Sequence, residues 1–88
     1  MPTISMFYGI IIKMYWNETG RHKMPHVHAY YGGTEAVFSF DGDIITGEFP
    51  GKQAAYVKAW ILLHEEDLKA NWQLAADGEE LYRIEPLK

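Results

Sequence analysis

Two histidines two positions apart are the residues of this sequence best suited to chemistry. His26 and His28 lie in the segment Pro25-His26-Val27-His28-Ala29. Residues two apart on a β-strand point to the same side, so the two imidazoles would stand next to each other. Imidazole nitrogens bind zinc and similar metal ions, or exchange protons near neutral pH. The spacing therefore indicates either a metal site or an acid–base site.

A metal site at this pair would need a further ligand, because zinc takes at least three from the protein. The candidates are His64, Glu35, His22 and Glu48. His64 stands out because it falls within the apolar stripe of a predicted helix rather than on its charged side. The residues that alternate with the pair, from Val27 to Tyr31, are the more apolar set and should face the core. That assignment places the pair on the open face of the sheet, away from His64. The sequence leaves two alternatives. Either the three histidines converge on a divalent metal ion, or His26 and His28 form a simple pair on the open face of the sheet. No other cofactor is indicated.

The same residues suit phosphodiester cleavage by a nuclease-like enzyme, with His26, His28 and His64 as the catalytic candidates. Arg21 or Lys23 would stabilise the developing negative charge. The whole chain, however, has 8 basic and 12 acidic residues and a net charge of −4. Its field repels a polyanion, so nucleic-acid binding by the protein alone is disfavoured. The sequence favours a binding protein over an enzyme.

The predicted fold class is α+β, with a small antiparallel β-meander of about four strands and one long helix packed on one face. Alternation of apolar residues predicts strands at residues 7–16, 26–31, 34–40 and 44–48. Turn signals at residues 17–20 and at Gly32-Gly33 separate the first three strands. A short C-terminal strand at residues 81–84 would complete the sheet. Residues 1–88 form a single domain.

The predicted helix covers residues 52–76, with apolar side chains at intervals of three and four. Its stripe comprises Val57, Ile61, His64, Leu68, Trp72 and Ala75, and Trp60 and Leu63 widen it. A straight helix of this length would be about 37 Å long, so we expect it to bend, break near residues 69–71, or overhang. Asn71 is a poor helix former. Its position predicts a bend, or a side-chain hydrogen bond that ties the helix to a loop.

The composition is that of a globular domain kept in a reducing compartment. The sequence is 48% apolar and 15% aromatic, which supplies a core for a short chain. It has no cysteine, so disulfides and thiolate metal sites are excluded. The start lacks a basic leader, and the apolar run at residues 10–12 is far shorter than the ~20 residues of a membrane span. We therefore expect a cytoplasmic protein with no membrane partner.

A helix on one side of the sheet would leave the other side open. Tyr15, Tyr30 and Val37 fall on that open face and form the predicted partner-binding surface. Apolar and aromatic surfaces of this kind mark protein contacts. The leading functional prediction is a protein-interaction module that binds a small partner protein or a second copy of itself.

A set of short motifs runs through almost the whole chain. They are Met1-Pro2-Thr3-Ile4-Ser5 with Phe7-Tyr8-Gly9, the histidine segment with Tyr31-Gly32, Leu63-His64, Leu68, Asn71-Trp72, and Ile84-Glu85-Pro86-Leu87. This ordered set resembles the bacterial family known as domain of unknown function 4160. In that family two prolines often precede the first histidine and an aromatic residue separates the pair, where this chain has Met24 and Val27. The resemblance brings no established activity. Family members are often encoded beside another small domain, which implies a toxin–antitoxin-like pair.

Overall fold

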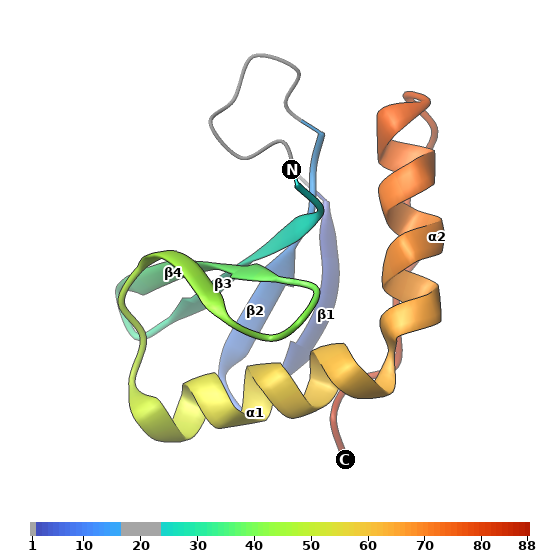
Figure 1. The fold of residues 1–88 in the computed structure, drawn as a ribbon. Coiled ribbons are helices and arrows are strands. Elements are labelled where there is room, and N and C mark those ends of the chain that lie inside the picture. The colour runs from blue at the N-terminus through green and yellow to red at the C-terminus, as the bar shows by residue number, and fades with distance from the viewer. Residues whose placement is uncertain (1, 17–23) are drawn as a thin grey trace.

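The structure is a computed structural model that describes residues 2–16 and 24–88. Within these ranges the chain forms five strands followed by two helices (Figure 1). They are β1 (Thr3–Phe7), β2 (Ile10–Lys13), β3 (His26–Tyr31), β4 (Thr34–Ser39), β5 (Ile44–Gly47), α1 (Gly51–Leu63) and α2 (Glu65–Ala76). The predicted α+β class is confirmed, with five strands in place of about four and two helices in place of one. The predicted turn at residues 17–20, the basic residues Arg21 and Lys23, and the candidate ligand His22 lie outside the described residues.

The five described strands form one antiparallel sheet in the order of the chain, β1-β2-β3-β4-β5. Directly paired residues of neighbouring strands point to the same face, so the register shows which side chains lie together. His28 pairs with Lys13 on β2 and with Val37 on β4. Val27 and Ala29, which alternate with the histidines, are completely buried in the core. Of the two alternatives left by the sequence, Val27 and Ala29 do face the core, but the side of β3 that carries His26 and His28 is not open, because both histidines are buried.

The first predicted strand, at residues 7–16, is in fact divided by a hairpin turn. The chain reverses at Tyr8 and Gly9, whose φ angles are 50° and 78°. Both angles lie in the left-handed region that a two-residue hairpin turn between twisted strands requires. Tyrosine is uncommon in this conformation, so the sequence at this point does not carry the usual signal for such a turn. The hairpin adds β1 at one edge of the sheet.

The long predicted helix is broken at His64, earlier than the expected position near residues 69–71. His64 has φ −116° and ψ 28°, and its amide is shared between the carbonyls of Trp60 and Ile61. After it, α2 leaves at a steep angle to α1 and runs beside the sheet (Figure 1). A straight helix over residues 51–76 would be about 39 Å long, which exceeds the 33 Å greatest extent of the molecule. The break allows both helices to pack on one small core.

The hydrophobic core lies between the sheet and these two helices. α1 contributes Val57, Trp60 and Ile61, and α2 contributes Leu68, all without exposed surface. The strands contribute Ile4, Ile10, Ile12, Val27, Ala29 and Phe38. Within the described ranges, neither helix has the length and apolar character needed to cross a bilayer.

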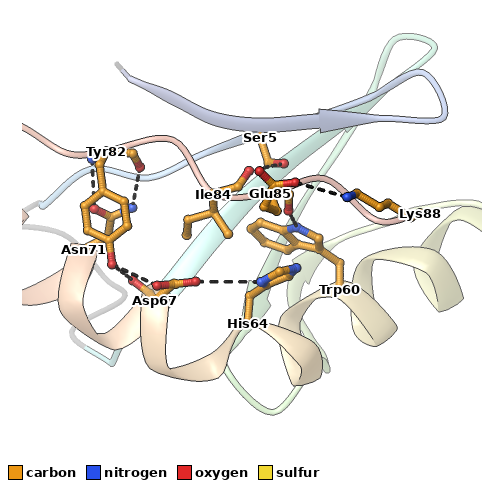
Figure 2. A network of polar contacts seen from close by, with 9 residues as sticks. All are labelled: Ser5, Trp60, His64, Asp67, Asn71, Tyr82, Ile84, Glu85 and Lys88. Atoms are coloured by element: carbon orange, nitrogen blue, oxygen red, sulfur yellow. Dashed lines mark hydrogen bonds and ion pairs between the residues drawn. The ribbon is translucent and has the colours of Figure 1, made fainter.

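Asn71 connects α2 to the C-terminal tail through two hydrogen bonds to the backbone of Tyr82 (Figure 2). The Asn71 Nδ2 donates to the Tyr82 carbonyl at 2.8 Å, and the Tyr82 amide donates to the Asn71 Oδ1 at 3.1 Å. Asn71 is completely buried. The predicted hydrogen bond from Asn71 to a loop is therefore confirmed.

The rest of the tail is held by β1 and α1. The Ser5 hydroxyl donates to the carbonyl of Ile84 at 3.0 Å, and the Ile84 amide donates to the carbonyl of Ile4 at 2.7 Å. The Trp60 indole donates to the carbonyl of Glu85 at 2.8 Å (Figure 2). Residues 81–84 therefore run beside β1 but form no strand, which corrects the prediction of a C-terminal strand.

Candidate functional site

His26 and His28 lie next to each other on β3, and both are buried, with 3% and 7% of their surface exposed. Their ring centres are 5.2 Å apart. The Nδ1 of His28 lies 3.2 Å from Oε2 of Glu35, and the Nδ1 of His26 lies 2.8 Å from the carbonyl oxygen of Met24. A carboxylate and a carbonyl can only accept hydrogen bonds, so each neutral imidazole carries its proton on Nδ1. The Nε2 atoms are then the basic nitrogens of the pair.

Aromatic side chains pack against both histidines. Tyr15 stacks on His28 with ring centres 4.6 Å apart and planes inclined by 21°. Trp72 of α2 meets His26 edge to face at 5.1 Å. The pair thus lies on the face opposite the core residues of β3, but His26 still reaches a helix. These rings help to bury two side chains that the sequence places on an open face.

Glu35 on β4, one of the residues considered from the sequence as a further ligand, is a shared acceptor in this cluster. It pairs with Tyr30 directly across the β3–β4 hairpin. The pKa of Tyr30 is raised, first by burial, then by the negative charge of Glu35, by Tyr15 and by a hydrogen bond to Glu35. The Lys13 ammonium lies 5.2 Å from the centre of the Tyr30 ring. Because the turn after Tyr31 fixes the hairpin register, the position of Glu35 beside Tyr30 could have been inferred from the sequence.

His64 does not join the histidine pair. It lies at the junction of α1 and α2, with its ring 5.6 Å from that of Trp60 and its Nδ1 3.8 Å from Oδ2 of Asp67. In the part of the chain that the structure describes, no three residues of the types His, Cys, Asp and Glu are placed to hold a metal ion. The grouping of His26, His28 and His64 considered from the sequence is therefore not formed there.

The predicted partner-binding residues on the outer face of the sheet offer little surface. Val37 is only 6% exposed, and Tyr15 and Tyr30 are half-buried. The most exposed large apolar side chains on α1 are Leu62 and Leu63, at 55% and 70%. Leu62 and Leu63 have the largest exposed fractions among the large apolar side chains of the described residues, and Met6, which pairs with Ile11 on the outer face of the sheet, is 53% exposed.

The outer side of α1 carries exposed apolar residues together with the exposed Lys52 and with Lys58, which lies 3.8 Å from Asp43. The outer side carries four exposed apolar residues at intervals of three and four, which we call the α1 face: Ala55, Ala59, Leu62 and Leu63. Lys52 continues this face at its N-terminal end. Exposed apolar side chains gathered on one face often mark a protein contact. The α1 face therefore has the character of a surface that another molecule covers.

The position of Leu63 corrects the sequence prediction, which placed it beside the core stripe. Leu63 is the last residue of α1, and the chain changes direction at His64. A stripe calculated for one continuous helix no longer describes which residues face the sheet once the helix is broken. Leu68 and Trp72, beyond the break, do pack inward, with Leu68 completely buried and Trp72 half-buried against the core.

The fold and these surfaces define a small α+β domain with a buried histidine pair and an exposed apolar helix face. A family model described as Domain of unknown function (DUF4160) matches residues 9–73. The chain belongs to this family, as its motifs indicated. The matched range includes the histidine pair and Asn71-Trp72, whereas β1 and the tail lie outside it. A search of curated proteins found no match, and a search of solved structures found none either.

Proposed function

We propose that this protein is a protein-interaction module of the bacterial cytoplasm that binds its partner through the α1 face. The observation that supports this most directly is the exposure of Leu62 and Leu63 on a helix whose opposite side is already in the core. Full burial of one such leucine side chain contributes about 1.5–3 kcal/mol. The resemblance to a family whose members are often encoded beside another small domain is the basis for proposing that this protein is one half of a toxin–antitoxin-like pair.

The two small residues of the α1 face suit this role. Ala55 and Ala59 are one helical turn apart and both are exposed. Short side chains allow a second helix to approach closely, and the larger Leu62 and Leu63 can then insert beside it. The nearby Tyr8, 53% exposed and with its ring 5.1 Å from that of Tyr56 on α1, extends the same apolar surface.

A photo-crosslinking amino acid placed at Leu63 tests the proposal in cells that express the protein. We expect an adduct of discrete mass from position 63 and none from Ala70, an exposed residue of α2 that serves as the matched control. Adding Ala59→Arg should remove the adduct, since a long charged side chain then stands in the middle of the face. Equal adducts from both positions, or none from either, would contradict binding through the α1 face.

A second candidate function is general acid–base catalysis of phosphodiester cleavage, supported by the contact between His28 and Glu35. A carboxylate that accepts a hydrogen bond from Nδ1 orients an imidazole, as it does in catalytic histidine–carboxylate pairs. If this function is correct, purified protein should cleave an RNA oligonucleotide and His28→Asn should abolish the cleavage. His64→Asn, remote from the pair, should not. Absence of cleavage by the unaltered protein would remove this candidate.

A further inference from the structure

The charges at the two ends of α1 are complementary to each other, which points to a particular occupant of the α1 face. Lys52 lies at the N-terminal end of this face. At the other end, α2 begins immediately after His64 with three acidic residues, Glu65, Glu66 and Asp67. Among the described residues, Glu65 lies 4.0 Å from Lys69 and Asp67 lies 3.8 Å from His64, whereas Glu66 forms no ion pair. The C-terminal end of a helix also carries partial negative charge, and the last turn of α1 holds no basic residue to offset it.

From this arrangement we infer that the α1 face binds a second copy of this chain, with the two α1 helices antiparallel; the inference deepens the proposed function and depends on it. A two-fold axis near Ala59 places Lys52 of each copy just beyond the C-terminal end of the other copy's α1, beside the start of its α2. The same axis sets Ala55 opposite Leu63, so a large side chain meets a small one. Such an interface is self-complementary, as a two-fold dimer requires.

The other orientation and other partners fit less well. In a parallel arrangement, Lys52 of one copy would face Lys52 of the other, and the acidic residues at the start of α2 would face the same residues of the other copy. Like charges would then repel at both ends of α1. A strongly basic partner would be attracted by the acidic residues at the start of α2 but repelled by Lys52 on the α1 face. In the antiparallel arrangement, opposite charges of the two copies lie near each other at both ends of α1.

The size of the α1 face predicts a weak dimer. A helix of 13 residues is about 20 Å long and about 10 Å wide. The contact therefore covers on the order of a few hundred Å² on each protomer, below the roughly 800 Å² per partner of a standard interface. We expect the dimer to form in the micromolar to millimolar range and to exchange quickly with the monomer.

Sedimentation of the full chain from about 10 µM to about 1 mM tests this inference. We expect a reversible monomer–dimer equilibrium that Ala59→Arg shifts to monomer and the matched control Ala70→Arg leaves unchanged. Lys52→Glu should weaken dimerisation about tenfold, and the double variant Lys52→Glu with Glu66→Lys should restore it. Restoration occurs only in the antiparallel arrangement, because a parallel dimer has like charges facing each other in either case.

Two results would overturn the inference. One is a protein that stays monomeric throughout this range. The other is a dimer that ignores Ala59→Arg or that the charge exchange does not restore. The proposed function fails separately: if sedimentation shows a monomer but crosslinking from Leu63 captures a different protein, the α1 face is still an interaction surface and only the second-copy inference is wrong.

Discussion

At the residue scale, the buried polar side chains of this domain hold the fold together. They are Ser5, His26, His28, Ser39 and Asn71. In the described part of the chain, no buried side-chain nitrogen or oxygen lacks a hydrogen-bond partner. Burying a polar group without a partner is costly, so each of these residues depends on the group it contacts. Several motif residues therefore have structural roles that a sequence motif alone does not distinguish from catalysis.

Asn71→Ala tests the most complete of these contacts. The substitution leaves both the amide and the carbonyl of Tyr82 without their partner on α2. We expect the free energy of unfolding to fall by about 2–4 kcal/mol. Gln73→Ala, which removes an exposed side chain bonded only to Asp77, should change it by less than about 0.5 kcal/mol. The measurement is equilibrium unfolding in urea. Similar small losses for the two variants would show that the Asn71 bonds contribute little.

Tyr30 gives the stability of the protein a dependence on alkaline pH. Because folding raises its pKa, the folded state keeps the phenol proton at a pH where the unfolded chain loses it. The contribution is complete below pH ~10 and is lost as pH rises from there through the folded pKa. Tyr30→Phe should therefore make stability fall less steeply with pH. The pKa of Tyr82 is also raised, by burial and by Asp67, so part of the dependence of stability on alkaline pH remains in the Tyr30→Phe variant. Urea unfolding at several alkaline pH values measures it, and identical slopes would refute the assignment.

At the element scale, the sequence predicts best where local chemistry decides the outcome. β3 has the predicted bounds because apolar alternation before Gly32 leaves little choice. The break at His64 is different, since the residues around it are good helix formers and the periodicity runs through it. The need to fit two helices on a small core sets the break. The exposure of Leu63 follows from the break, so it could not be predicted from periodicity.

Gly47 fixes the position of β5 beside β4. Its φ is 87°, and a Cβ there would lie 2.5 Å from the carbonyl oxygen of Glu35. Gly33 has a φ of 86° but no atom within 4 Å of such a Cβ. Gly33→Ala should thus cost about 1–2 kcal/mol, from backbone strain alone. Gly47→Ala should cost at least about 1 kcal/mol more because of the clash. Thermal unfolding of both variants separates strain from clash, and equal losses would mean that β5 moves aside freely.

At the scale of the whole molecule, the histidine cluster and the α1 face lie on opposite sides of the core. The histidines alternate along β3 with the core residues Val27 and Ala29, and α1 contributes Val57, Trp60 and Ile61 to that core. Any acid–base chemistry and any partner binding are therefore physically separate. Of these two regions, the histidine pair could be found from spacing alone. The α1 face could be identified only from the three-dimensional fold, because Leu62 and Leu63 are of the same residue type as residues in the core.

Leu63→Ala and Leu68→Ala compare the surface and core leucines of the two helices. Leu63 is 70% exposed and Leu68 is completely buried. We expect Leu68→Ala to lower the free energy of unfolding by about 2–5 kcal/mol. Leu63→Ala should change the unfolding of the monomer by no more than about 0.5 kcal/mol. Urea unfolding at low protein concentration measures both. A large loss from Leu63→Ala would mean that α1 packs with a different side inward.

The fastening of the tail to β1 has a consequence for the kinetics of folding. The hydrogen bond from Ser5 joins residues separated by 79 positions, whereas the β3–β4 hairpin joins neighbours in the sequence. Closing a long loop costs more entropy than closing a short one. The hairpins should therefore form early and the tail should dock last. Contacts made after the transition state slow unfolding without speeding folding. The tail contacts thus set the unfolding rate, while the hairpins set the folding rate.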